Sequence, residues 1–200
     1  MNAHMPSDTP QEMQDPLDEE WVRRARQGDH AAFEGIVQRY GKAIYRHMYR
    51  MMLNREDAED LTQEAFIRAF RYVDRLETGG SLRSWLYTIA TRVGLNALRS
   101  QYRRGKAVTS SYEAHVENAG DLQAPGCGAS AEHAALRDEL EVAMAALQPR
   151  AALLIQLHHT EGFPIREAAA IVGMSPASAK VALCRARKEL RERLLKENQA

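Results

Sequence analysis

The stretch 56–71 constrains the fold of this 200-residue chain more than any other part of the sequence. It contains neither proline nor glycine and consists largely of strong helix formers, so it predicts an α-helix. At about 100° per residue, its apolar residues share one face and its charged residues share the other. The apolar face comprises Ala58, Leu61, Ala65, Phe66, Ala69 and Val73, and the polar face comprises Asp57, Asp60, Gln63, Glu64, Arg68 and Arg71.

Ile67 lies in the middle of this charged face. An apolar residue in that position is exposed to water unless a partner covers it, so the face is a candidate docking surface for another protein. The simpler alternative is a solvated face, because single exposed apolar residues and charged helix faces are both common.

The formal net charge is zero, but the charges are segregated along the chain. Residues 1–20 hold six acids and no Lys or Arg, whereas residues 81–112 hold six basic residues and no acid. Residues 176–200 hold seven basic and three acidic residues. An acidic start followed by two basic segments is typical of a DNA-binding protein with two contact regions.

The segment 81–104 predicts a helix with a core stripe and an adjoining polar stripe. The core stripe comprises Leu82, Leu86, Ile89, Val93 and Ala97, and the second comprises Trp85, Thr88, Arg92, Asn96, Arg99 and Arg103. An aromatic ring, hydrogen-bonding groups and cations without any acid suit stacking on an unpaired base together with phosphate contacts. For Trp85 alone, packing half-buried against the core is an equally open interpretation.

The C-terminal part predicts a helix-turn-helix. A short helix at 165–172 ends at Gly173, and Ser175-Pro176 provides the cap and first turn of a long basic helix. The apolar positions Ala179, Leu183, Ala186, Leu190 and Leu194 should pack on the preceding helices. We expect the N-terminal half to enter the major groove, with Lys180 and Arg185 on bases or phosphates. Arg187, Lys188 and Arg191 are better placed for the DNA backbone.

These patterns predict an all-α chain with two small helical domains. The expected divisions are a disordered tail at 1–16, a first domain at 17–104, a flexible linker at 105–131 and a second domain at 132–197. Further helices are expected at about 18–27, from Asp29 to Met48, and at 132–146 and 150–160, with a glycine turn at 77–80.

The sequence contains no run of 18 apolar residues, and its N-terminus is polar and acidic. We therefore expect no membrane insertion, no signal peptide and a cytoplasmic protein. Cys127 and Cys184 are far apart and are expected to be free thiols, with no metal site and no cofactor. The His158-His159 pair is assigned no role.

Four strings resemble bacterial sigma factors, in particular the extracytoplasmic-function group. The stretch from Gly28 to Tyr40 resembles the opening of the region 2 domain. The string from Asp57 to Arg71 is similar to the region 2 helix, and Ser84-Trp85-Leu86-Tyr87-Thr88-Ile89-Ala90 is similar to the Trp-Leu-Tyr segment of that region. The string 165–175, with Lys180 and 185–190, resembles region 4. The resemblance covers about Leu17 to Leu195, and departures at Thr91-Arg92 and Val181-Ala182 leave the promoter sequence open.

The resemblance implies a non-enzymatic factor that binds core RNA polymerase, directs it to promoters and promotes DNA melting. The implied partners are the clamp and flap of the polymerase, promoter DNA and an anti-sigma factor. The implied polymerase-binding residues are Asp57, Asp60, Gln63, Glu64, Ile67, Arg68 and Arg71. The implied minus-10 contacts are Ser81, Trp85, Thr88, Arg92, Asn96, Arg99 and Arg103, after a loop at 76–81 that holds a flipped base. The implied minus-35 contacts are Ser175, Ser178, Lys180, Val181, Cys184, Arg185, Arg187, Lys188 and Arg191.

Two other classes of protein are the alternatives to a sigma factor. No motif supports an enzyme, because the sequence has no Walker loop, nucleophile elbow or zinc-spaced His/Cys set, and its seven histidines are scattered. The other is a one-component helix-turn-helix regulator, which would bind promoter DNA tightly without polymerase.

Overall fold

The computed structural model describes residues 16–76, 81–103, 139–140 and 142–197. Within these ranges all regular structure is helical and there is no β-strand, so the all-α prediction is confirmed. The expected turn at 77–80, the linker at 105–131 and all but the last residue of the expected tail lie outside the described residues.

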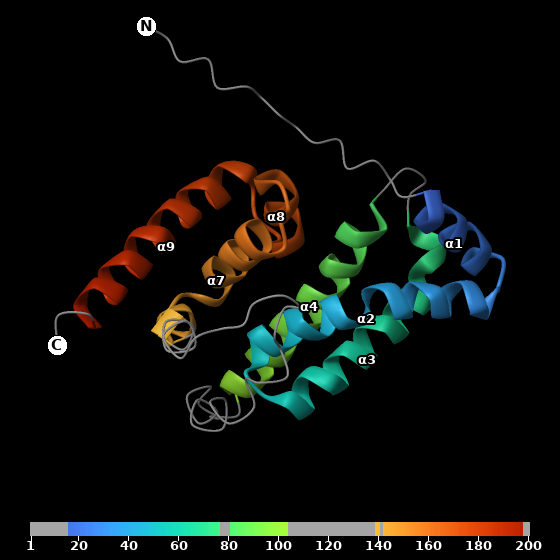
Figure 1. The fold of residues 1–200 in the computed structure, drawn as a ribbon, viewed down its shortest axis with the longest axis horizontal. Coiled ribbons are helices and arrows are strands. Elements are labelled where there is room, and N and C mark those ends of the chain that lie inside the picture. The colour runs from blue at the N-terminus through green and yellow to red at the C-terminus, as the bar shows by residue number, and fades with distance from the viewer. Residues whose placement is uncertain (1–15, 77–80, 104–138, 141, 198–200) are drawn as a thin grey trace, which may run out of the picture.

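Four helices form the first domain (Figure 1). They are α1 (Pro16–Arg26), α2 (His30–Met52), α3 (Arg55–Tyr72) and α4 (Leu82–Arg103), with a short 3-10 turn, η1 (Val73–Arg75), after α3. The first helix begins at Pro16, which the sequence placed in the tail; proline suits the first turn of a helix because its missing N–H has no partner there.

Side-chain caps fix where the helices begin. The side chain of Asp29 accepts a hydrogen bond from Ala32 N at 3.2 Å, and Asn54 accepts one from Asp57 N at 2.9 Å. These caps bind backbone donors that the first turn of a helix leaves without partners. The caps therefore set the register in which α2 and α3 present their apolar faces to the core.

The centre of the bundle is α2, which contacts α1, α3 and α4. Ile36, Ile44 and Met48 of this helix are fully or almost fully buried. Opposite them, α3 buries mainly alanines and one phenylalanine, so the two helices can approach closely. This close packing turns the opposite, charged face of α3 outward.

The second domain is built from α7 (Pro149–Ile155), the π-helical segment η4 (Gln156–Thr160), α8 (Ile165–Val172) and α9 (Pro176–Glu197). Residues 139–140 and 142–145 are the described helical parts of the helix expected at 132–146. The prediction of one regular helix over 150–160 is wrong at its C-terminal half. Glu161 N bonds to Gln156 O at 3.0 Å, a π-type bond that widens the last turn and buries both Gln156 and Leu157.

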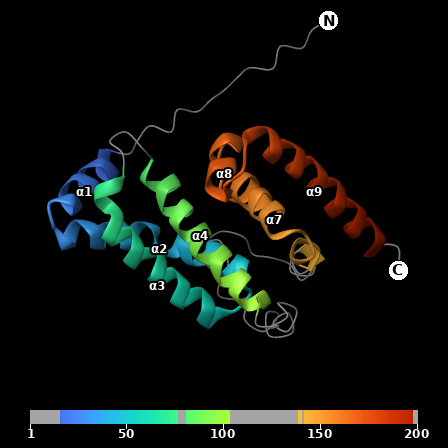
Figure 2. The same ribbon diagram turned by 180° about the vertical axis from the view of Figure 1, so that it is seen from behind.

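The two domains are in contact through α4 and α8. Figure 1, and Figure 2 from behind, show α8 beside α4. Tyr87 and Phe163 meet edge to face with their ring centroids 4.9 Å apart. The buried apolar residues of the described chain consequently form one continuous cluster that runs through both domains.

Candidate functional site

The outward face of α3 carries the residues that the sequence assigned to protein docking. Asp60, Gln63, Ile67 and Arg71 are exposed, whereas Asp57, Glu64 and Arg68 are half-buried. The last two pair within the helix, with Arg68 Nε 2.7 Å from Glu64 Oε1. Asp57 is drawn toward α4, because it accepts a hydrogen bond of 3.0 Å from Gln101 Nε2.

The docking face is more apolar than the sequence indicated. Ile67 is 48% exposed, and Phe70 beside it is 39% exposed. Phe70 packs edge-on against Phe33, with centroids 5.0 Å apart, and stacks on His30 at 5.4 Å. A helical projection places Phe70 next to Gln63, so the spacing of the sequence carries this signal. The exposed aromatic edge enlarges the candidate contact area.

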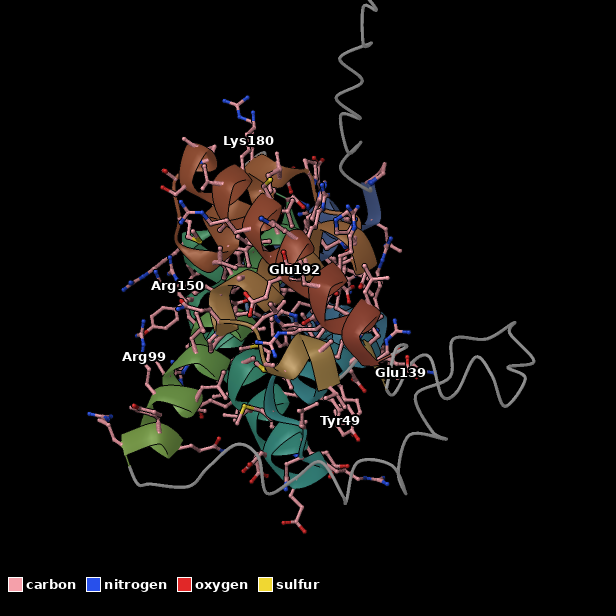
Figure 3. All side chains as sticks on the ribbon, turned by 90° about the vertical axis from the view of Figure 1, so that its left-hand side faces the viewer. Tyr49, Arg99, Glu139, Arg150, Lys180 and Glu192 are labelled. Carbon is pink, nitrogen blue, oxygen red and sulfur yellow. The ribbon has the colours of Figure 1, made fainter. Side chains whose placement is uncertain are left out.

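The polar stripe of α4 faces outward. Arg92, Asn96, Arg99 and Arg103 are exposed, and Trp85 and Thr88 are half-buried. Arg99 Nη1 donates to Asn96 Oδ1 at 3.4 Å, and Figure 3 shows Arg99 extending from α4 away from the body of the protein. Since α4 contains no acidic residue, these cations have no internal counter-charge on their own helix.

Two hydroxyl groups among the implied minus-10 contacts form hydrogen bonds within the first turns of α4. Ser81 Oγ accepts a hydrogen bond of 3.2 Å from Ser84 N and so caps the helix. Thr88 Oγ1 donates to Ser84 O at 2.8 Å. Both residues therefore hold the first turns of α4 in place, at the end that carries Trp85.

The turn between α8 and α9 sets the direction of the basic helix. Gly173 takes the left-handed conformation, with φ of 70°, and Met174 N bonds back to Ala169 O at 2.8 Å. Ser175 Oγ then caps α9 by accepting from Ser178 N at 3.2 Å. This is the geometry of a helix-turn-helix.

The basic helix packs on α7 and α8, and Ala179, Leu183 and Ala186 are its buried residues. The polar and cationic residues on the other sides are exposed, and Figure 3 shows Lys180 extending away from the domain. The exposed set comprises Ser175, Ser178, Lys180, Val181, Cys184, Arg185, Arg187, Lys188 and Arg191. The N-terminal part of α9 is thus accessible enough to lie in the major groove of a DNA duplex.

Lys188 Nζ lies 3.9 Å from Glu192 Oε1 within α9, and Arg187 is bound more closely within its own domain. Its Nε and Nη2 atoms lie 3.1 Å and 2.6 Å from His159 Nε2. A ring nitrogen that accepts from a guanidinium must be unprotonated, and burial, Arg187 and His158 together lower the pKa of His159. Arg187 is therefore held against His159, on the side of α9 that faces η4.

The described residues thus present two cationic helical faces and one mixed charged and apolar face. No group of three or more potential metal ligands occurs in the parts of the chain that the structure covers. Nor does any helix there have the length and apolar character needed to cross a bilayer. Fold and surfaces together define a helical DNA-binding protein with a helix-turn-helix, and the outer face of α3 is a separate candidate surface for docking another protein.

Comparison with known proteins identifies the family of the chain. Residues 36–104 match the family model Sigma-70 region 2, and residues 137–190 match Sigma-70, region 4. The RNA polymerase sigma factor CarQ of Myxococcus xanthus is 32% identical over 174 residues, which cover 86% of this chain and 95% of CarQ. The ECF RNA polymerase sigma factor SigE of Mycolicibacterium smegmatis is 30% identical over 175 residues. The chain belongs to the RNA polymerase sigma factors, in the extracytoplasmic-function group.

The extent of the matches varies among relatives. The chain spans 66% of the length of the Mycolicibacterium SigE protein and 43% of SigW from Bacillus subtilis. Among solved structures, CnrH in complex with the cytosolic domain of CnrY aligns with a TM-score of 0.65 at 24% identity, covering 90% of this chain and 98% of CnrH. At this identity the likeness establishes the shared two-domain helical fold.

Proposed function

We propose that this protein is a transcription initiation factor that binds core RNA polymerase, directs it to specific promoters and promotes melting of the DNA. It acts by binding and positioning and catalyses no reaction itself. The observation that carries this proposal is the presence, on one chain, of an acid-free cationic stripe beside a tryptophan and a helix-turn-helix. The first suits unpaired DNA and the second suits a duplex.

The polymerase docks on the outer face of α3 in this proposal. Ile67 and the edge of Phe70 supply apolar area, and Asp60 and Gln63 supply exposed hydrogen-bonding groups around it. An apolar centre with a polar rim is the usual composition of a protein interface. The clamp of the largest subunit is the expected partner for this face.

Promoter DNA is bound at two places. The α4 stripe receives the melted non-template strand of the minus-10 element, with Trp85 as the stacking platform and Arg92, Arg99 and Arg103 on phosphates. The exposed start of α9 enters the major groove of the minus-35 element, with Lys180 and Arg185 as the readers. The protein is expected to work in the cytoplasm, where the polymerase is.

An anti-sigma factor is the remaining proposed partner. The titles of two similar structures describe complexes of this kind, CnrH with the cytosolic domain of CnrY and RpoE with the anti-sigma factor NepR from Bartonella quintana. We propose that this chain is held inactive by a protein of the same class.

The test is whether DNA binding depends on the polymerase. The purified chain is mixed with a labelled promoter duplex, with and without core RNA polymerase, and binding and run-off transcripts are measured. We expect specific binding and transcripts only when core is present. Tight, sequence-specific binding by the chain alone would favour the one-component regulator instead.

The docking face can be tested separately with Asp60→Ala combined with Gln63→Ala. Losing two interfacial hydrogen-bonding groups should weaken binding to core roughly tenfold, since each contributes about 0.5–1.5 kcal/mol. Affinity is measured by titrating labelled protein with core. Glu34→Ala with Gln38→Ala is the matched control, because it likewise removes one carboxylate and one amide from exposed positions, here on α2. Equal affinity of both double variants would contradict the assignment of α3.

A further inference from the structure

The His158-His159 pair, which has no role in the sequence analysis, lies near the end of η4 and contacts the basic helix. His159 Nε2 lies 3.1 Å from Nε and 2.6 Å from Nη2 of Arg187. A guanidinium can only donate, so Nε2 is the acceptor and the proton of the neutral ring is on Nδ1. Both side chains are exposed. An arginine on the surface of α9 is therefore held by an uncharged acceptor from another element.

His158 connects this contact to the interior of the second domain. Its Nδ1 atom lies 2.9 Å from the backbone carbonyl oxygen of Phe163, and because a carbonyl oxygen can only accept, Nδ1 donates. Phe163 itself has no exposed surface. The rings of His158 and His159 are in contact, with centroids 4.8 Å apart. The orientation of the His159 ring is thus supported by a neighbour that is bound to a buried residue.

The π-helical segment that carries both histidines is anchored at its two ends. Gln156 Nε2, at its start, lies 3.0 Å from the ring nitrogen Nδ1 of the fully buried His47. Glu161, directly after it, accepts a hydrogen bond of 2.6 Å from Tyr87 Oη. A π-type turn is wider than an α-helical turn, so it changes the direction in which its side chains project, and such turns often occur at functional sites. The anchored turn directs His159 toward α9.

Arg187 lies where α9 would leave the major groove. It follows Lys180 by seven positions, so it has nearly the same angular position and lies about 10 Å farther along the helix axis. The major groove is about 12 Å wide, so a helix that places Lys180 in the groove brings Arg187 close to the sugar-phosphate backbone. Phosphate contacts fix the register and orientation of a protein on the duplex. Arg187 is therefore in position to orient the reading end of α9.

The uncharged acceptor leaves the charge of Arg187 intact. A guanidinium has N–H groups on Nε, Nη1 and Nη2, and His159 accepts from Nε and Nη2. The edge formed by Nη1 and the second hydrogen of Nη2 can still bind a phosphate in a bidentate manner. Burial, followed by the effects of Arg187 and His158, lowers the pKa of His159, which keeps the ring neutral at neutral pH.

Arg193, on the same helix, shows the opposite arrangement. Its Nη2 atom lies 2.8 Å from Glu189 Oε1, so a carboxylate both orients this guanidinium and cancels its charge. Binding of phosphate by a cation gains free energy by releasing counterions from the DNA, and an internally neutralised arginine gains little from this release. The choice of imidazole or carboxylate as the internal partner thus decides whether an oriented arginine remains effective toward DNA.

We propose that His159 is a positioning residue for promoter binding, which holds Arg187 in the orientation that binds a phosphate of the minus-35 element and leaves its positive charge intact. This inference rests on the proposed function, because it requires α9 to lie on the minus-35 duplex. His159 acts through Arg187 and makes no contact with DNA itself. Holding the guanidinium in place before binding reduces the conformational entropy that binding would otherwise cost.

The first test is a double-mutant cycle on the complete complex. Core polymerase assembled with the full chain is titrated against a labelled promoter duplex that contains the minus-35 element. His159→Ala should weaken binding roughly two- to tenfold, because an arginine without its support must be immobilised on binding. The same substitution should have no further effect when Arg187→Ala is already present. His159→Gln should retain most of the parental affinity, because its amide oxygen is also an uncharged acceptor.

The second test is the dependence of binding on salt, which a purely structural role of His159 would not change. Affinities are measured between about 50 and 200 mM salt. His159→Glu should reduce the magnitude of the log–log slope by about 0.9, as Arg187→Ala does, because a neutralised arginine no longer releases a counterion. His159→Gln should keep the parental slope. Arg193→Ala is the matched control and should also keep it, because this exposed arginine of α9 is already paired with Glu189.

The outcomes separate this inference from the proposed function. Far-UV circular dichroism verifies that every variant is folded. Equal weakening by His159→Ala with and without Arg187, or a parental salt slope in His159→Glu, would overturn the role of His159. If the parental complex fails to bind the promoter at all, the proposed function is overturned as well. Normal parental binding with an additive cycle overturns this inference alone.

Discussion

At the scale of single residues, His47 shows how a side chain can be fixed by two domains at once. An amide nitrogen can only donate, so the contact from Gln156 leaves Nδ1 of His47 as the acceptor. Nε2 then carries the proton and donates to Thr91 Oγ1 at 2.9 Å. The neutral ring satisfies both contacts, and burial, with a smaller effect from Arg50, lowers the pKa of His47 to about 3.

This burial predicts a loss of stability in mild acid. The unfolded chain binds a proton at His47 below about pH 6.5, whereas the folded chain does not bind one until about pH 3. The free energy of unfolding should therefore fall between pH 7.5 and pH 5.5, with about 1.4 kcal/mol of the change due to His47. Urea denaturation at the two pH values measures it.

The corresponding variant is His47→Gln, which removes the titrating ring. Its loss of stability between pH 7.5 and pH 5.5 should be about 1.4 kcal/mol smaller than that of the parent protein. Gln38→Ala, an exposed substitution on the same helix, should retain the parental loss. An unchanged pH dependence in His47→Gln would show that the pKa of this ring is the same in the folded and unfolded protein.

The residues that sequence reasoning missed share a physical reason. A helical projection assigns the outward face of α3 and the stripe of α4 because periodicity separates apolar from polar positions. Tyr87 and Glu161 are polar side chains whose partners come from more than 70 residues away, so no local spacing marks them. Their role depends on how two domains meet, which single-helix patterns do not contain.

At the scale of elements, two glycines of α2 provide a matched pair. A Cβ at Gly35 would lie 2.9 Å from Cε2 of the Trp21 ring, whereas a Cβ at Gly41 would meet nothing within 4 Å. Gly41→Ala should raise the free energy of unfolding by about 1 kcal/mol through helix propensity. Gly35→Ala should lower it by about 1 kcal/mol, because displacing α1 outweighs the same gain. Urea denaturation compares them, and equal stabilisation would contradict close packing of α1.

The basic helix α9 carries its own prediction. Lys180→Ala with Arg185→Ala should weaken contact with the minus-35 element at least tenfold, since each good base contact is worth about 1–3 kcal/mol. Footprinting of the polymerase complex measures protection upstream and at the minus-10 element separately. Arg150→Ala with Arg193→Ala removes two exposed cations outside the proposed surface and should leave the footprint unchanged. Full upstream protection in the first variant would show that another face of α9 meets DNA.

The bounds of helices that begin and end at strong local sequence signals could be predicted. The π-helical segment η4, which depends on tertiary contacts, could not. The bounds 165–172 of α8 follow from Pro164 before it and Gly173 after it, and the structure reproduces them. The π-helical segment after α7 has no such signal. Its wide turn is stabilised by the burial of Gln156 against His47 and by the bond from Phe163 N to Leu157 O at 2.9 Å. Both stabilising contacts require the finished tertiary structure.

At the scale of the whole molecule, the sequence predicted two helical units but not their contact. The sequence predicted two small helical domains joined by a linker, and the buried cluster continues from α2 and α4 into α7 and α8. Part of what stabilises each domain is therefore supplied by the other. Separation of the domains should carry a free-energy cost even when both remain folded.

Because the two domains belong to one chain, their contact is an intramolecular equilibrium that does not change with protein concentration. A single cut in the segment between Arg103 and Glu139 would leave all the described contacts in place and yet make their formation bimolecular. The two pieces would then separate on dilution, and each would be free to bind its own target without the other. The intact chain between the domains thus sets a high effective concentration of each domain near the other. Cutting one peptide bond would remove that effective concentration and favour separated domains.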